Sequence, residues 1–152
     1  ILDAVRQGVS VSDIYLDVFQ QTQREIGQLW QMNQISVAQE HYCTAVTQFT
    51  MSQLYPYIFT AVRKDRRMVA TSVGGELHEI GIRMVADFFE LNGWDTYYLG
   101  ANTPAESVVQ AVAENGADLV AISATLTPHV QKVANLVEAI RTMKRPPREL
   151  VR

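Results

Sequence analysis

The spacing of apolar residues changes near residue 63 of this 152-residue chain. Before that point, apolar side chains recur every three or four residues, as on one face of a helix. Ser10 or Ser12 can begin a helix of about 20 residues, which Asn33-Gln34 interrupts, and Ser36 with Gln39 forms a capping box that begins the next helix. The pattern predicts a small helical bundle over residues 1–63. The apolar residues expected in its core are Ile14, Val18, Phe19, Ile26, Leu29 and Trp30 on the first helix and Tyr42, Ala45, Val46 and Phe49 on the second.

From residue 67 onward the apolar residues form short continuous runs separated by helical segments. Such runs predict parallel strands buried on both faces, at Met68–Val73, Asp95–Leu99 and Ala117–Ser123. Gly93 and Gly116 are suited to end the helices between them, and Thr103-Pro104-Ala105-Glu106 predicts a capping box. The result is a right-handed βαβαβ unit over residues 67–152, which predicts a Rossmann-like (flavodoxin-like) α/β domain whose last strands lie outside this chain.

Composition and charge narrow the functional classes. Hydrophobic residues make up 47% of the chain and charged residues 19%, as in soluble globular proteins, and the net charge of -3 argues against direct nucleic acid binding by this segment. No apolar run reaches the ~20 residues of a membrane span. A single cysteine, Cys43, excludes an internal disulfide and fits a reducing compartment, so we expect a cytoplasmic protein. We also expect the chain to be part of a longer protein with a fused output domain. A homo-oligomer is a further hypothesis.

The loop after the first predicted strand is the place to look for chemistry, because ligands of α/β domains bind at the carboxyl ends of strands. It reads Gly74-Gly75-Glu76-Leu77-His78-Glu79-Ile80-Gly81, with neither a phosphate-binding loop nor a dinucleotide fingerprint. Glu76 can accept one imidazole N–H of His78 and leave the other nitrogen free for a metal. Gly81 would allow a bulky group to approach the backbone. Judged from the residues alone, a His near a helix start is more commonly a surface or capping residue than a metal ligand.

This segment resembles the cobalamin-binding domain family, whose fingerprint places an acid, a cobalt-ligating His and a Gly at this spacing. The resemblance implies that His78 is the lower cobalt ligand and that Glu76, in place of the usual Asp, orients it. The second fingerprint of the family, Ser-x-Leu after the third strand, matches at Ser123 but has Thr125 at the Leu position. The cofactor-binding residues that the resemblance implies here are Glu76, Leu77, His78, Ile80, Gly81, Ser123, Thr125 and Thr127.

The helical half carries a second constellation, Trp30 followed after nine residues by Glu40-His41. It resembles the helical cap of light-sensing cobalamin regulators, in which these residue types cover the adenosyl group above cobalt. The best-studied regulators have a second His after the Trp, whereas this chain has Gln31, so trapping of cobalt between two histidines is not implied. From the residues alone, Trp30 fits core packing, and Glu40 with His41 fits a solvated helix face. The third histidine, His129, is expected to be exposed at a helix start.

Together these features predict a cobalamin-binding sensory module, light-responsive through adenosylcobalamin, and a regulatory domain in preference to an enzyme. Methylcobalamin and hydroxocobalamin are the alternative forms of the cofactor. The competing hypotheses are a corrinoid methyl-carrier subunit of a methyltransferase system, which would share His78, and an α/β interaction module without a cofactor.

Overall fold

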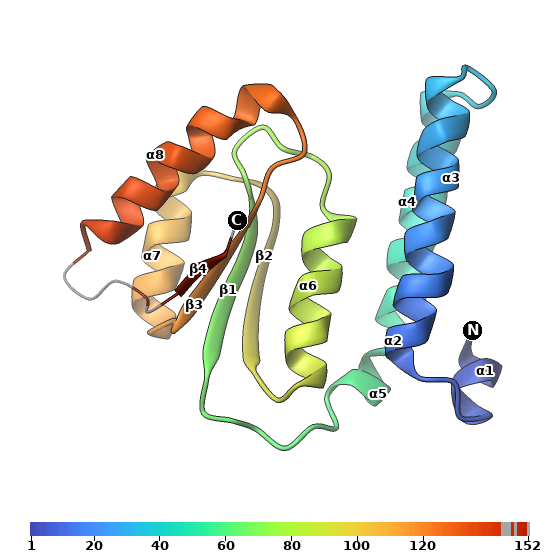
Figure 1. Ribbon diagram of the computed structural model, residues 1–152, viewed down its shortest axis with the longest axis horizontal. Coiled ribbons are helices and arrows are strands. Elements are labelled where there is room, and N and C mark those ends of the chain that lie inside the picture. The colour runs from blue at the N-terminus through green and yellow to red at the C-terminus, as the bar shows by residue number, and fades with distance from the viewer. Residues whose placement is uncertain (144–146, 148, 152) are drawn as a thin grey trace. The chain divides into compact units, whose positions relative to one another are not determined.

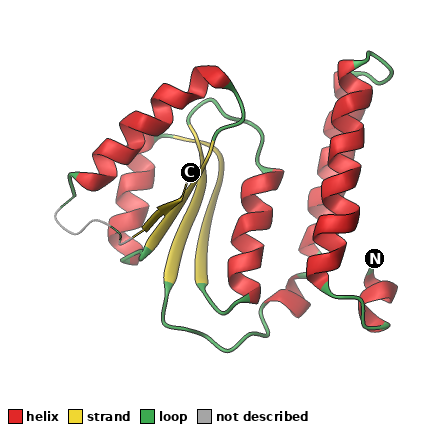
Figure 2. Ribbon diagram, in the orientation of Figure 1, coloured by secondary structure: helices red, strands yellow, loops and turns green. Residues whose placement is uncertain are grey.

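The computed structural model describes residues 1–143, 147 and 149–151 and divides into two compact units, Ile1–Thr60 and Ala61–Arg152. The first unit is helical, whereas the second combines helices with strands (Figure 2). None of the described helices is long and apolar enough to cross a membrane.

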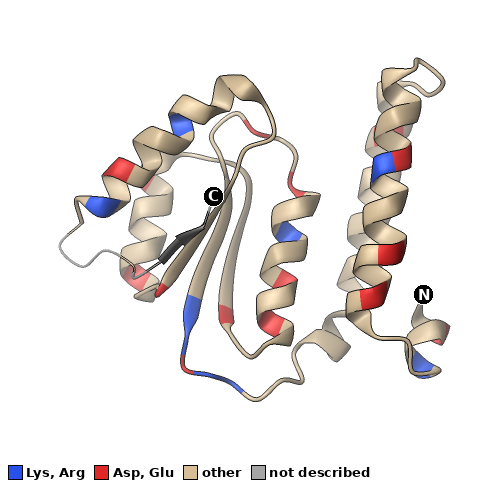
Figure 3. Cartoon of the chain, in the orientation of Figure 1, with Lys and Arg blue, Asp and Glu red and all other residues tan. Residues whose placement is uncertain are grey.

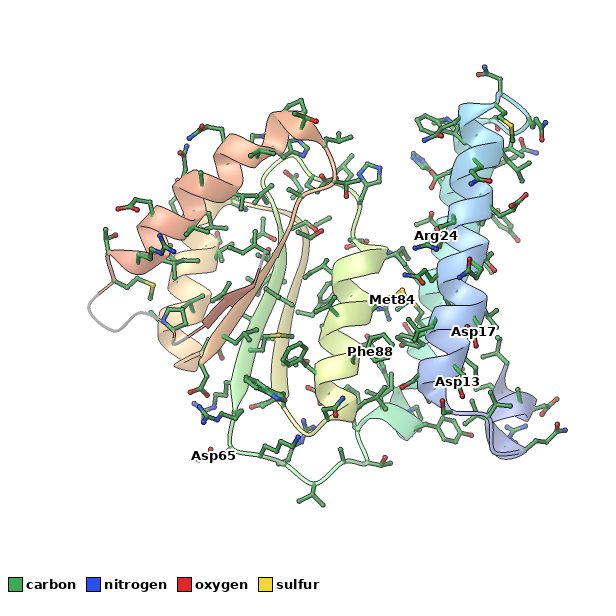
Figure 4. The ribbon with its side chains drawn as sticks, in the orientation of Figure 1. Asp13, Asp17, Arg24, Asp65, Met84 and Phe88 are labelled. Carbon is green, nitrogen blue, oxygen red and sulfur yellow. The ribbon has the colours of Figure 1, made fainter. Side chains whose placement is uncertain are left out.

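Two long helices dominate the first unit (Figure 1). The first is a continuous run of α2 (Val11–Asp13), the π-helical segment η1 (Ile14–Phe19) and α3 (Gln20–Gln31), and the second is α4 (Val37–Ser52). Short helices α1 (Leu2–Arg6) and α5 (Tyr55–Ile58) flank them. Ser10 caps the first long helix by accepting from Asp13 N (3.0 Å), and both hydrogen bonds of the predicted Ser36–Gln39 capping box are present. Asp13, Asp17 and Arg24 lie on the exposed surface of the first long helix (Figure 4).

The core of the first unit differs from the predicted apolar stripes. Tyr42 and Phe49 are 71% and 68% exposed, and α4 instead buries Thr47 and Met51. The face of α4 that lies toward α3 includes a polar contact, in which Gln23 Nε2 donates to Thr47 Oγ1 (2.8 Å). The predicted stripe on α4 is therefore wrong, and an apolar row is left on its surface. Val18, Trp30 and Val46 are exposed as well.

The second unit is a four-stranded parallel sheet in the order β2-β1-β3-β4. In Figure 1, α6 covers one face of this sheet while α7 and α8 cover the other. The predicted Rossmann-like α/β fold is confirmed, and β4 is a strand that the sequence pattern did not identify. The elements are β1 (Arg67–Val73), α6 (Ile80–Leu91), β2 (Asp95–Thr103), α7 (Ala105–Asn115), β3 (Leu119–Ser123), the 3-10 turn η2 (Thr127–His129), α8 (Val130–Arg141) and β4 (Glu149–Val151).

Alternate residues of the central strands fill two separate cores. Met68 and Ala70 of β1 pack with Leu119 of β3 on the α6 side, while Val69 and Val120 pack on the side of α7 and α8. This is the period of two that side chains follow along a strand. The sheet is thus buried on both faces, as its continuous apolar runs predicted.

The boundaries of the helices confirm part of the sequence reasoning. Gly93 and Gly116 follow α6 and α7 with φ of +83° and +57°, in the left-handed region that glycine enters without a steric penalty. The predicted capping box at Thr103 is wrong. β2 continues through Thr103, whose hydroxyl lies near the carbonyl oxygens of β2, and Pro104 is the N-cap of α7 without a side-chain cap.

Basic residues gather on the segment that leads into β1, at the amino end of the sheet (Figure 3). Arg63 pairs with the buried Glu90 (2.5 Å) and Arg66 with Asp118 (3.2 Å). These contacts fasten the segment to α6 and to the start of β3. The carboxyl ends of the strands, at the opposite end of the sheet, hold the loop with His78.

Candidate functional site

Glu76 is the hub of the loop after β1 and is fully buried. Its Oε1 accepts a hydrogen bond from His78 N (3.0 Å) and lies 2.5 Å from His78 Nδ1. Its Oε2 accepts from the backbone amides of Thr125 (2.6 Å) and Leu126 (3.3 Å) and lies 3.0 Å from His129 Nδ1. One carboxylate therefore joins the loop after β1 to the loop after β3.

The charge of Glu76 determines which nitrogens carry protons. Burial raises the pKa of this carboxyl, but the hydrogen bonds donated by His129, His78 and Thr125 outweigh burial and hold the pKa well below its usual range. An ionised carboxylate only accepts hydrogen bonds, so Nδ1 of both imidazoles must be protonated. In the neutral imidazole, His78 Nε2 then carries a lone pair. Because the His78 side chain is 60% exposed, that nitrogen is available to a metal.

The end of β2 holds the same loop from another side. Asn102 Oδ1 accepts from Gly75 N (2.7 Å), and Asn102 N donates to Glu76 O (2.9 Å). Asn102 has φ of +53°, which Asn tolerates better than most residues. A side-chain hydrogen bond also joins this loop to β2, because Glu79 Oε2 accepts from Tyr98 OH (3.0 Å). The backbone around His78 is thus fixed by contacts from two neighbouring strand ends.

A cavity of about 240 Å³ opens beside the start of α6. A Cβ atom added at Gly81 would meet nothing within 4 Å, so the wall is open at this point. The structure brings the predicted residues Gly81 and Ser123 together here, although the sequence separates them by more than forty positions. The residues lining the cavity are Gly81, Ile82, Val85, Ala121, Ile122, Ser123 and Ala124.

The other predicted residues of this unit lie around the same strand ends. Leu77 is 73% exposed, Thr125 contributes its amide to Glu76, and Thr127 begins η2. Ile80 is the first residue of α6. His129 was expected to be exposed, and this is wrong, because it is only 8% exposed and bonded to Glu76.

The predicted residues of the helical unit gather near the turn between α3 and α4. Trp30 and Gln31 end α3, and Glu40 and His41 lie in the first turns of α4. Trp30 is 44% exposed, so packing in the core of the helical unit does not account for it. Glu40 Oε1 accepts from Thr44 Oγ1 (2.9 Å), and its Oε2 lies 3.6 Å from His41 Nε2. The His41 side chain is 74% exposed.

Sequence reasoning missed His129 and Asn102 as members of the site. Only the tolerance of Asn for left-handed backbone could have suggested Asn102, and no local signal marks His129. Within the described part of the chain, no group of three or more His, Cys, Asp or Glu side chains could hold a metal ion. A metal at His78 would therefore need most of its ligands from a group that it brings with it.

Comparison with known proteins identifies that group. A family model described as B12 binding domain matches residues 66–148, more than half of the chain, and a second model with the same description matches residues 1–55. The chain belongs to the B12-binding domain family. Cobalamin carries its cobalt in a corrin ring, which supplies four of the metal's ligands. The predicted family resemblance, including the helical part, is thereby confirmed.

Relatives of this B12-binding chain fall into two kinds. The HTH-type transcriptional repressor CarA of Myxococcus xanthus is 28% identical over 104 residues, which are 68% of this chain and 36% of that protein. Dimethylamine corrinoid protein 2 of Methanosarcina acetivorans is 26% identical over 82 residues, which are 54% of this chain and 38% of the relative. The chain thus matches less than two-fifths of the length of either curated relative.

A solved structure has the same fold as this B12-binding chain. The monomethylamine corrinoid protein of Methanosarcina barkeri superposes with a TM-score of 0.77 over 94% of this chain and 68% of that one, at 24% sequence identity. The B12-binding relatives include a repressor and corrinoid proteins alike, so membership of the family is compatible with either role.

Proposed function

We propose that this chain is a sensory module that binds adenosylcobalamin, responds to light and acts on an output domain outside the chain. The observation that supports the binding of cobalamin is the Glu76–His78 pair. The buried carboxylate fixes the proton of His78 on Nδ1 and leaves Nε2 free on an exposed side chain. Among the described residues, no hydrogen bond to Nε2 competes with a metal. His78 is therefore suited to be the lower axial ligand of cobalt.

The surroundings of His78 fit the rest of the cofactor. Corrin supplies four nitrogen ligands, so one imidazole is enough to complete the lower side. The open cavity beside Gly81 and Ser123 is suited to the nucleotide tail of cobalamin. We assign residues 67–152 to the Rossmann-like cobalamin-binding domain and residues 1–63 to the helical cap.

Trp30, Glu40 and His41 lie at one end of the two long helices. These residues support a cap over the upper face of the cofactor. Trp30 offers an aromatic surface on which an adenine ring could stack, and Glu40 and His41 offer polar partners. A methyl group would leave this surface without a partner, which favours adenosylcobalamin over methylcobalamin and hydroxocobalamin. When bound, adenosylcobalamin supplies a cobalt–carbon bond that light can break. Trp30, Glu40 and His41 would shield the adenosyl group from water before illumination.

A regulatory role is supported by the match to a transcriptional repressor, which extends over 68% of the chain. Gln31 follows Trp30 and has no imidazole, so it is a weak candidate for a second cobalt ligand. A cytoplasmic location and the absence of direct nucleic acid contacts by this segment stay predictions from its composition.

The decisive experiment reconstitutes the chain in the dark with adenosylcobalamin and methylcobalamin separately and records absorbance and small-angle scattering before and after green light. We expect tighter binding of the adenosyl form and light-induced changes in both measurements. An adenosyl-loaded protein that keeps its spectrum and scattering profile under light would contradict the sensory role.

In nitrogen-15-labelled protein with cobalt reduced, histidine hyperfine coupling should be present and should disappear in His78→Ala. Its absence from the wild type would contradict the ligand assignment.

A corrinoid methyl carrier is the second candidate, and the similarity to a dimethylamine corrinoid protein favours it. Such a carrier would use His78 in the same way but would not need the Trp30 surface. It should bind methylcobalamin at least as tightly as the adenosyl form and exchange methyl groups with a methyltransferase. The comparison of the two cofactors in the dark therefore separates the two candidates.

A further inference from the structure

A further cavity of about 250 Å³ lies at the carboxyl end of β1, on the face of the sheet that α7 and α8 cover (Figure 1). Its apolar wall is made by Val73, Ala105 and Leu136. Val73 and Leu136 belong to the core on that face. The cavity beside the start of α6 is lined by Ile82 and Ala121 instead, which belong to the core on the other face. The sheet therefore separates this cavity from the one assigned to the nucleotide tail.

Lys132 carries the only charge among the described residues that line this cavity. Its Nζ donates to Gly74 O (2.7 Å), which uses one of the three N–H donors of an ammonium group. Lys132 takes part in none of the ion pairs within the described part of the chain. A cation without an acidic partner at the wall of a cavity favours a ligand with a negative charge.

α8 presents a second donor beside Lys132. Asn135 follows Lys132 by three positions, so both side chains lie on the same face of the helix. Asn135 Oδ1 accepts from Gln131 Nε2 (2.9 Å), which leaves the N–H donors of Nδ2 for another acceptor. Lys132 and Asn135 are both exposed, so a ligand can reach them from solvent. Donors of two side chains thus stand beside an apolar wall.

The volume of the cavity limits the size of its ligand. Sites for drug-sized molecules measure about 300 to 1,000 Å³, so a cavity of about 250 Å³ suits a molecule of a few carbon atoms. We propose that this cavity binds a small aliphatic carboxylate, whose oxygens accept hydrogen bonds from Lys132 Nζ and Asn135 Nδ2 while its carbon chain packs against the apolar wall. This site is separate from the proposed function, because none of its residues is assigned to cobalamin.

NMR titration of the apoprotein with butyrate tests the site, with butyramide as the neutral analogue of the same size. We expect butyrate to shift the signals of Val73 and Leu136 with a Kd on the order of 1 mM, as for other ligands of so few atoms. Butyramide should bind about tenfold more weakly, because a hydrogen bond to an ionised group is roughly twice as strong as one between neutral groups.

Two substitutions act on the two halves of the site. Lys132→Met removes the charge but keeps a long side chain, and it should weaken butyrate binding about tenfold and abolish the preference over butyramide. Ala105→Leu narrows the cavity while Lys132 stays, and it should weaken the binding of both probes. Arg141→Met is the matched control, since Arg141 is an exposed cation in the last turn of the same helix, and it should leave the affinity for butyrate unchanged.

Equal affinities for butyrate and butyramide in the wild type would overturn the proposal. An unchanged affinity for butyrate in both Lys132→Met and Ala105→Leu would also overturn it. So would loss of the butyrate shifts when cobalamin is added in the dark, because the cofactor itself would then occupy the cavity. Failure of the proposed function has a different signature, which is the absence of histidine coupling in the loaded wild type. The titration of the apoprotein is independent of that result.

Discussion

Glu76→Gln is the most informative single substitution, because it preserves size while exchanging one acceptor oxygen for a donor. If the new NH2 group at position 76 pointed toward the loop after β3, its hydrogens would meet the N–H groups of Thr125, Leu126 and His129. We therefore expect this NH2 group to point toward His78. His78 must then change tautomer to accept from it, and the His78 backbone N–H loses its acceptor. Nε2 becomes protonated, so binding of cobalt through Nε2 requires the tautomer to change back at a cost in free energy.

The expected loss of stability can be worked out from these contacts. One buried N–H without an acceptor costs about 1 to 3 kcal/mol. The remaining hydrogen bonds lose their charge assistance, which adds roughly 1 to 2 kcal/mol. We expect Glu76→Gln to lower the free energy of unfolding of the apoprotein by about 2 to 5 kcal/mol at neutral pH, a large share of the stability of an ordinary domain.

The pH dependence provides an internal check. The pKa of Glu76 is lowered in the folded state, so its stabilising effect is complete above the unfolded pKa of about 4.3 and is lost as the pH falls from there toward the native pKa. Gln does not titrate. The difference in unfolding free energy between wild type and Glu76→Gln should therefore be largest at neutral pH and narrow below about pH 4.3.

Urea unfolding at several pH values measures both quantities, with Glu138→Gln as the matched control, since Glu138 is exposed on α8. The control should change stability by less than about 0.5 kcal/mol. The reasoning fails if the two variants are equally stable, or if the effect of Glu76→Gln is the same in acid as at neutral pH. Cobalamin affinity should also fall in Glu76→Gln, by about 10- to 100-fold.

Three further outcomes are expected. Gly93→Ala should destabilise the apoprotein by at least about 1 kcal/mol, because φ is +83° and the new Cβ would lie 2.2 Å from Val62 O. Gly27 lies in open space within α3, so Gly27→Ala should stabilise the apoprotein by about 0.5 to 1 kcal/mol. Thermal unfolding of both variants checks the two signs. Ser36→Ala should cost about 1 kcal/mol by the same assay, through loss of the capping box of α4. Trp30→Ala should weaken adenosylcobalamin binding by about 1 to 3 kcal/mol and methylcobalamin binding less, and equal losses in titrations of the two cofactors would argue against a role in the cap.

The α/β fold was predictable because its signals are local. Continuous apolar runs marked β1 and β3, and Gly93 and Gly116 marked the ends of helices. The Glu76–His78 contact was predictable for the same reason, since the partners are two positions apart in the sequence.

The misses come from contacts that the local sequence does not encode. The burial of His129 depends on a carboxylate 53 positions away, and a histidine after Thr127-Pro128 otherwise resembles any exposed helix start. The buried face of α4 is the one on which Thr47 bonds to Gln23, although Tyr42 and Phe49 form the more apolar row. Hydrophobic spacing alone could not choose between these faces.

The irregular end of β2 has a consequence beyond the site. β2 lies at one edge of the described sheet, and an edge strand offers unpaired backbone groups on which another chain can add. The pairing of β1 with β2 shifts register twice after Ala70, and Gly100 and Asn102 both have positive φ. Such a bent strand is a poor template for a further straight one. The same distortion places Asn102 against the loop with His78. We therefore expect that straightening this end of β2 would favour the addition of another strand at the edge as well as weaken cofactor binding.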